Sequence, residues 1–311
     1  MQTIHNNPDL FKIVTPIDIP KLCWYISSHP NWPFIDSICD GLEHRFWPWA
    51  DADPLNYPLT NNTKQHPTPV LAKATFLHQQ HDKEVGKGQL LQGLEGPLQP
   101  GMYCMPIFVV PKNKPSKYCL VTHQSFGPYA LNSMTPPHEC AFPLDNIIWL
   151  GDQLLWKHKA NPKKGIVLWK SDISEAYHLI PVHPLWQIKQ VNIINDVCYI
   201  DHCNTFSGRQ SGDIFIGVNS CILWAAEHVR DVDNPSTYID GHPGLNYEGE
   251  VELYHGYEIP KWLPRGKARL FAFWNDLGVP HEEEKQEHGP CLDYLGLHID
   301  TVDLTITMPA D

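Results

Sequence analysis

The chain has 311 residues, of which 42% are hydrophobic and 19% are charged, so it can form a core and wholesale disorder is excluded. Its net charge of −12 argues against a protein that coats nucleic acid with a uniformly basic surface. No apolar run reaches the roughly 18 residues that a membrane span needs, and the N-terminus lacks a secretion signal. The nine cysteines follow no disulfide pattern, so we expect an intracellular protein of the cytoplasm or nucleus that is not secreted and has no membrane partner.

Residues 1–100 are predicted to form a loop-rich extension with short helices. Apolar residues recur at helical spacing from Ile35 to Phe46, and the pattern stops at Pro48. A second helix is predicted over 70–85, where glycines close it. A connection rich in Gly and Pro follows.

Residues 101–164 are predicted to form a β-hairpin followed by a helix. The β-branched and aromatic residues of 105–112 and 117–124 indicate two strands that pair across a short turn. The segment 144–158 carries apolar residues at helical intervals, which predicts an amphipathic helix.

Strand and helix patterns alternate in the last part of the chain, residues 165–311. The predicted elements, in chain order, are a strand over 165–173, a helix over 211–229, short strands on both sides of a turn near Tyr238, a helix over 266–278, and a final hairpin of 291–299 with 304–308. This order favours an α+β fold in which helices pack on one face of an antiparallel sheet.

Two aspartates are the strongest candidates for chemistry. Asp172 comes at the end of the predicted strand over 165–173, and Asp240 lies at the turn in the stretch Tyr-Ile-Asp-Gly, 238–241. Carboxylates at the ends of neighbouring strands can share divalent metal ions, and Mg²⁺ prefers such oxygen ligands. Each feature also has a purely structural explanation, because Asp commonly caps a turn and Asp-Gly is an ordinary hairpin signal.

Nearly the whole chain resembles the reverse-transcriptase-like open reading frames of fungal retroelements, akin to the polymerases of DIRS-type, tyrosine-recombinase retrotransposons. The resemblance rests on LFKIVTPI, FWPWA, GMYCMPIFVVPK, GPYALNSM, KSDISEAYHLIPVHPLWQIKQV, LGVPHEEEKQ and LTITMP, and it is most specific over 171–191. It implies fingers over 101–164 and a palm over 165–311, with neither a thumb nor an RNase H domain. The implied activity is that of an RNA-directed DNA polymerase, a two-metal nucleotidyl transfer to a primer 3′ hydroxyl. The implied cofactor is Mg²⁺ or Mn²⁺, and the implied partners are an RNA or DNA template-primer and deoxynucleoside triphosphates.

The resemblance also implies roles for single residues. Asp172 and Asp240 would be the catalytic metal ligands, and Tyr177 would be an aromatic gate whose ring excludes a ribose 2′-hydroxyl. Further residues that would contact the nucleotide or its template are Lys112, Lys117, Arg209, Gln210 and Lys285.

Three positions depart from the pattern of this family. Gly241 stands where a second aspartate would follow Asp240, Cys119 stands where an arginine is usual, and His123 stands where an aspartate is usual. Each departure removes a charge that the site would use. The sequence therefore leaves two alternatives open. One is a crippled polymerase, and the other is a catalytically inactive retroelement remnant, or a nucleic-acid- or protein-binding scaffold, that keeps the palm fold.

Overall fold

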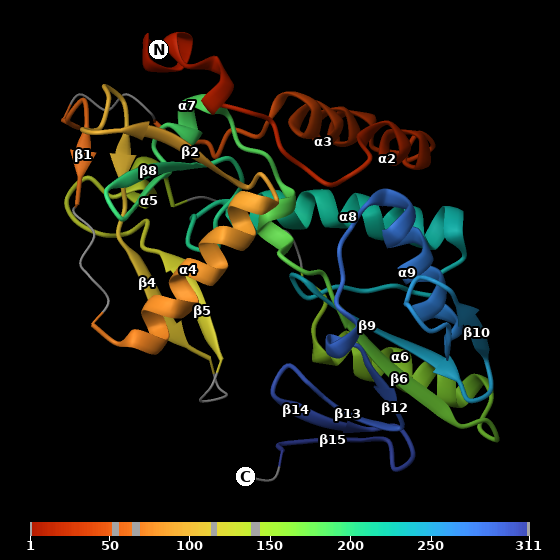
Figure 1. The fold of residues 1–311 in the computed structure, drawn as a ribbon. Coiled ribbons are helices and arrows are strands. Elements are labelled where there is room, and N and C mark those ends of the chain that lie inside the picture. Colours follow the sequence, from red (N-terminus) through yellow and green to blue (C-terminus); the bar gives the residue numbers. More distant parts are fainter. Residues whose placement is uncertain (1, 52–55, 64–68, 113–116, 138–143, 310–311) are drawn as a thin grey trace. The chain divides into compact units, whose positions relative to one another are not determined.

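The computed structural model describes residues 2–51, 56–63, 69–112, 117–137 and 144–309 (Figure 1). The chain folds as two compact units, each built from separated segments. Unit 1 comprises 1–15, 37–140 and 177–215, and unit 2 comprises 16–36, 141–176 and 216–311. The predicted boundaries at residues 100 and 164 stay a prediction.

Unit 1 contains a five-stranded sheet and a separate two-stranded hairpin. The sheet has the order β1-β3-β7-β8-β2, with β1 (Asn61–Asn62), β2 (Leu90–Glu95), β3 (Tyr103–Cys104), β7 (Val191–Ile194) and β8 (Val197–Asp201). The hairpin is β4 (Ile107–Pro111) with β5 (Tyr118–Thr122). The helices are α1 (Gln2–Asn6), η1 (Pro8–Leu10), α4 (Leu71–Gly86), α5 (Leu131–Met134) and α7 (Pro184–Gln187). Helix α4 packs against β2 and the hairpin.

Unit 2 is organised around a three-stranded antiparallel sheet of order β12-β6-β9. Its strands are β6 (Ile166–Asp172), β9 (Gly241–Tyr247), β10 (Val251–Tyr254), β11 (Lys261–Pro264), β12 (Glu287–Gly289), β13 (Cys291–Tyr294), β14 (Leu297–Asp300) and β15 (Thr305–Thr307). Its helices are α2 (Ile19–Tyr25), α6 (Ile147–Ala160), α9 (Arg265–Leu277) and η3 (Glu283–Lys285). Three elements begin in one unit and end in the other, and these are α3 (Trp32–His44), η2 (Ala176–Leu179) and α8 (Ser211–Arg230).

The α+β class with an antiparallel sheet is confirmed, but helices cover both faces of the unit 2 sheet rather than one. Helix α6 packs on the face that carries Leu168 and Leu245. Helix α9 lies on the opposite face, where Gly266 approaches the ring of Trp169 and Trp274 meets His242 edge-on. Side chains alternate between the faces of a strand, so the two helices cannot share one face.

Most predicted elements are present near their predicted positions. The structure confirms α3, α4, α6, α8, α9, β4, β5 and β6. The turn predicted between β4 and β5 lies outside the described residues. In the described part of the chain, no helix is long and apolar enough to cross a membrane.

Two predictions near the candidate site were wrong in detail. The segment before Tyr238 is not a strand, because it forms only an isolated bridge to Gly241. The predicted final hairpin is a three-stranded sheet, because 291–300 already forms the β13–β14 hairpin and β15 adds a third strand. The extra turn is made by Leu295 and Gly296, whose φ angles of 51° and 74° are those that a two-residue hairpin turn requires.

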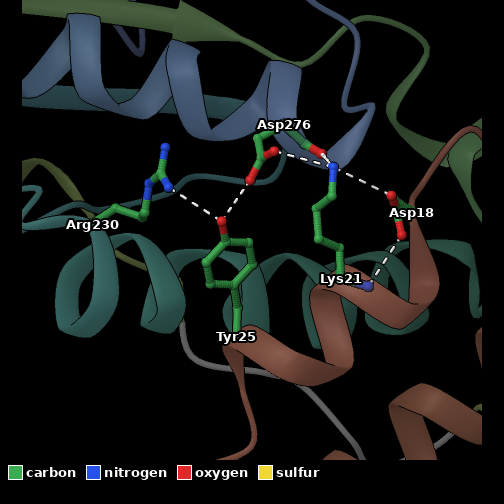
Figure 2. A network of polar contacts seen from close by, with 5 residues as sticks. All are labelled: Asp18, Lys21, Tyr25, Arg230 and Asp276. Atoms are coloured by element: carbon green, nitrogen blue, oxygen red, sulfur yellow. Dashed lines mark hydrogen bonds and ion pairs between the residues drawn. The ribbon is translucent and has the colours of Figure 1, made fainter.

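A polar network ties α2 to the ends of α8 and α9 within unit 2 (Figure 2). The Tyr25 hydroxyl donates to Asp276 Oδ2 at 2.6 Å, and Lys21 Nζ lies 3.1 Å from Asp276 Oδ1. Arg230 donates to the Tyr25 hydroxyl at 3.2 Å, and Asp18 accepts from the Lys21 amide. The hydrogen bond from Tyr25, with the ammonium of Lys21, lowers the pKa of Asp276.

Replacing Tyr25 by Phe should lower the free energy of unfolding by about 1 kcal/mol at pH 7, because a hydrogen bond to a charged carboxylate is lost. The lowered pKa of Asp276 makes its stabilisation present above the pKa of an unfolded aspartate and lost as the pH falls through the folded pKa. The deficit of Tyr25→Phe should therefore shrink in acid. Urea denaturation at several pH values measures both effects.

Tyr257→Phe is the matched control, because the buried Tyr257 hydroxyl has no hydrogen-bond partner among the described residues. We expect this control to cost nothing. A deficit for Tyr257→Phe as large as that for Tyr25→Phe would contradict the assigned role of the network.

Candidate active site

Asp172 and Asp240 lie together because of the register between β6 and β9. Asp172, the last residue of β6, pairs with Gly241, the first residue of β9. The Ile173 amide continues the ladder by donating to the Asp240 carbonyl oxygen at 3.0 Å. The two carboxylates singled out in the sequence therefore lie at the same end of the unit 2 sheet.

Asp240 is carried by a two-residue turn that closes tightly. The Tyr238 amide donates to the Gly241 carbonyl oxygen at 2.8 Å, and the Gly241 amide donates back to the Tyr238 carbonyl oxygen at 3.1 Å. Ile239 takes the first turn position with φ of 58°, where hairpins of this kind prefer glycine. A β-branched residue in this region is strained by about 1–3 kcal/mol, and such strain persists only where the surroundings hold it.

The electrostatics of the pair favour a cation. Burial, and then the neighbouring charge of Asp240, raise the pKa of Asp172. Burial also raises the pKa of Asp240, while its own backbone amide and Lys285 act in the opposite direction. Two half-buried carboxylates with raised pKa values are relieved when a divalent cation binds between them.

The donor set for a metal ion is small. Among the described residues, no group of three or more His, Cys, Asp and Glu side chains is arranged to hold a metal. Two carboxylates still fit Mg²⁺, which takes one or two protein ligands and completes its shell with water and phosphate oxygens. His242 is not a third ligand, because it is fully buried and faces away from this edge on the alternating strand. Burial lowers the pKa of His242 to about 3, so its ring is neutral.

Gly241 marks the place where a third carboxylate would stand. A Cβ atom at this position would lie 3.6 Å from Asp172 Oδ1 and 3.8 Å from the ring of Tyr294, which is ordinary van der Waals contact. A side chain at 241 would therefore point toward the carboxylate of Asp172. An aspartate at this position would therefore add a carboxylate beside the pair itself and not at a remote position.

Lys285 joins the two aspartates electrostatically. It lies in η3, its Nζ is 3.2 Å from Glu282 Oε2, and its charge offsets part of the rise in the pKa of both Asp172 and Asp240. Lys285, which the resemblance implies would contact the nucleotide or its template, therefore lies close to the carboxylate pair in unit 2.

The other predicted site residues belong to unit 1, and their roles stay predictions. Tyr177 packs edge-on against Phe206, with ring centroids 4.6 Å apart. Arg209 donates from Nη1 to the Thr135 carbonyl oxygen at 2.6 Å, and Gln210 is buried.

The two predicted lysines of the hairpin in unit 1 are exposed. Lys112 and Lys117 flank the β4–β5 pair and are joined by a hydrogen bond from the Lys112 amide to the Lys117 carbonyl oxygen at 2.8 Å. Cys119 is half-buried in β5, and His123 packs between Phe108 and Phe126.

Two residues near the carboxylate pair were missed in the sequence. Burial raises the pKa of Tyr294, and the charges of Asp172, Asp145 and Asp240 raise it further. Asp145 accepts a hydrogen bond from the Thr237 amide at 3.0 Å and so braces the start of the turn. The Tyr-Leu-Gly stretch that begins at Tyr294 could have drawn attention to this residue in the sequence, whereas no local sequence pattern marks Asp145.

Comparison with solved structures identifies the fold. A foamy viral protease-reverse transcriptase dRH in complex with double-stranded DNA has a TM-score of 0.57 and 12% identity, over 94% of this chain and 48% of that chain. A foamy viral protease-reverse transcriptase with double-stranded DNA gives 0.55 and 12%, over 96% and 58%. One with an RNA/DNA hybrid gives 0.56 and 13%, over 96% and 37%.

The chain therefore has a reverse-transcriptase-like fold of the α+β class. It spans less than two thirds of the length of each of these viral proteins. No family model matches the sequence, and no curated protein matches it.

Replacing Asp172 by Asn should stabilise the metal-free protein at pH 8 by on the order of 1 kcal/mol. The raised pKa means that the stability contributed by this carboxyl is present below the pKa of an unfolded aspartate and is lost as the pH rises through the folded pKa. The gain from Asp172→Asn should therefore vanish near pH 4. Urea denaturation in EDTA measures it.

Asp152→Asn, at an exposed position of α6, is the control and should leave the free energy of unfolding unchanged. Finding Asp172→Asn less stable than the unsubstituted protein at pH 8 would contradict the electrostatic description of the pair.

Proposed function

We propose that this chain is a reverse-transcriptase-like polymerase domain that adds deoxynucleotides to a primer 3′ hydroxyl, with RNA or DNA as template. The observation that carries the proposal is the pairing of Asp172, at the end of β6, with the strained turn that presents Asp240. The reverse-transcriptase-like fold supports it. On the sequence resemblance, we propose an origin in a DIRS-type fungal retroelement.

Asp172 and Asp240 would hold Mg²⁺ or Mn²⁺, which when bound would activate the primer hydroxyl and stabilise the leaving pyrophosphate. The chain's own residues prepare the site around this pair. The Ile173 amide fixes the Asp240 peptide at the end of β6. Lys285 places a positive charge near both carboxylates, which favours the phosphates of an incoming nucleotide.

The remaining roles follow from the resemblance. The ring of Tyr177 would meet a ribose 2′-hydroxyl and so favour deoxynucleotides. Lys112, Lys117 and Arg209 would contribute positive charge for the triphosphate or template. The net charge of −12 requires that such contacts with nucleic acid be local. The foamy viral proteins were solved with double-stranded DNA and an RNA/DNA hybrid, which supports a template-primer as partner here.

Gly241 and Cys119 favour weak catalysis. Loss of one metal ligand costs transition-state stabilisation, and each 1.4 kcal/mol lowers the rate about tenfold. The alternative function is therefore an inactive retroelement remnant, or a scaffold for nucleic acid or protein, that keeps the palm fold.

Primer extension on an RNA template with Mn²⁺ tests the proposal. We expect slow extension by the unsubstituted chain, none by Asp172→Ala, and at least tenfold faster extension by Gly241→Asp, which restores a carboxylate beside Asp172. Gly241→Asn is the matched control, since it adds similar volume without a charge and should bring no gain.

If the unsubstituted chain and Gly241→Asp are both silent in a folded preparation, the inactive alternative replaces the polymerase. Extension that persists in Asp172→Ala would show that the carboxylate pair is not the site.

Tyr177→Ala should increase ribonucleotide incorporation relative to deoxynucleotide incorporation by at least tenfold, since about 1.4 kcal/mol of steric discrimination corresponds to tenfold. Tyr177→Phe keeps the ring and should keep the preference. Competing nucleotides in primer extension, in the Gly241→Asp background, measure the ratio. Equal ratios for Ala and Phe would exclude a gate at this position.

A further inference from the structure

A small cluster of buried polar side chains lies behind the turn that carries Asp240. It consists of Asn219 on α8, Thr237 before the turn and His242 on β9, with exposed fractions of 0%, 7% and 0%. Burying polar groups costs free energy unless they form hydrogen bonds, so the hydrogen-bond partners of these three side chains indicate what the cluster does.

The cluster converges on one backbone atom, the carbonyl oxygen of Ile239. The Thr237 hydroxyl donates to it at 2.8 Å, and Asn219 Nδ2 donates to it at 3.2 Å. Asn219 Nδ2 also donates to Thr237 Oγ1 at 3.0 Å, which orients the hydroxyl. The carbonyl of Ile239 belongs to the peptide unit that leads into Asp240, so these donors fix the plane from which the Asp240 side chain departs.

His242 completes the cluster from the other side. Its Nε2 lies 3.2 Å from Asn219 Oδ1, and its ring packs edge-on against Trp274 at 4.9 Å. Because both donors of the Asn219 amide point at Thr237 and Ile239, its oxygen is left facing the ring. His242 Nδ1 also lies 3.1 Å from the Asp240 carbonyl oxygen, and a neutral ring donates from one nitrogen only, so each tautomer makes one of these two contacts a hydrogen bond. The ring of His242 thus lies between the Asn219 amide and the backbone of Asp240.

We propose that Asn219 and Thr237 are positioning residues that hold the strained backbone of Ile239 and thereby orient the Asp240 carboxylate toward a divalent cation shared with Asp172. The relevance to catalysis rests on the proposed function, because the cation site is the same. The backbone strain does not depend on the proposed function. Ile239 is β-branched and has a φ of 58°, which persists only if neighbouring groups hold it, and its carbonyl oxygen accepts from two buried donors.

The matched variants are Thr237→Val, which removes the hydroxyl at constant shape, and Thr237→Ser, which restores it. Ser236→Ala is the control, because the neighbouring buried Ser236 hydroxyl donates to Pro243 and not to the turn. The first readout is hydrogen exchange of the Gly241 amide, which closes the turn. The second is binding of Mn²⁺ alone, followed by electron paramagnetic resonance.

Thr237→Val should speed exchange of the Gly241 amide and weaken Mn²⁺ binding, each by about tenfold, while Thr237→Ser and Ser236→Ala should match the unsubstituted chain. Asn219→Ala should act in the same direction as Thr237→Val. Unchanged exchange at Gly241 in both Thr237→Val and Asn219→Ala would overturn the proposal.

The two proposals fail separately in this experiment. If Asp172→Ala binds Mn²⁺ as well as the unsubstituted chain does, the carboxylate pair is not a metal site and the proposed function falls. The exchange measurement still decides whether Asn219 and Thr237 hold the turn, because it needs neither metal nor activity.

Discussion

The pairing of β6 with β9 is the constraint on which the candidate site depends. The register runs from Ile166 opposite Tyr247 to Asp172 opposite Gly241. A shift by one residue would turn every side chain of β9 to the other face. The ring of Trp169 opposes such a shift, because it lies across Gly244 where no Cβ atom would fit. The contact between the Trp169 ring and Gly244 thus fixes the register that brings the Asp172 carboxylate to the Asp240 turn.

The same site is unfavourable for folding in two ways. Ile239 stores backbone strain, and burial raises the pKa of both carboxyls, so ionising them costs free energy in the folded state. Neither feature adds to the apolar core, which Leu168 and Leu245 form with α6 farther along the same two strands. A fold that keeps such features at one edge is typical of a functional site, where stability is given up for geometry.

The sequence predicted the parts of the site that local patterns encode. Asp172 followed an apolar run, and Asp240 lay in a turn signal, so both positions could be found without a structure. The roles of Asn219 and Thr237 could not, because their shared partner is a carbonyl oxygen whose position depends on a turn and on α8 together. The helices on both faces of the sheet were missed for a similar reason, since which face a strand residue occupies depends on the pairing register.

Gly241 changes the electrostatics of the site as well as its chemistry. An aspartate there would begin 3.6 Å from Asp172 Oδ1 and would add a third negative charge to a pair whose pKa values are already raised. Without a cation, that charge would be repelled by both neighbours. Compared with an aspartate, glycine would therefore weaken the proposed metal binding and would also lower the cost of folding without metal. Glycine in place of aspartate would therefore stabilise a chain that has no catalytic role, and it would slow a chain that must copy a template. The fold is compatible with both outcomes.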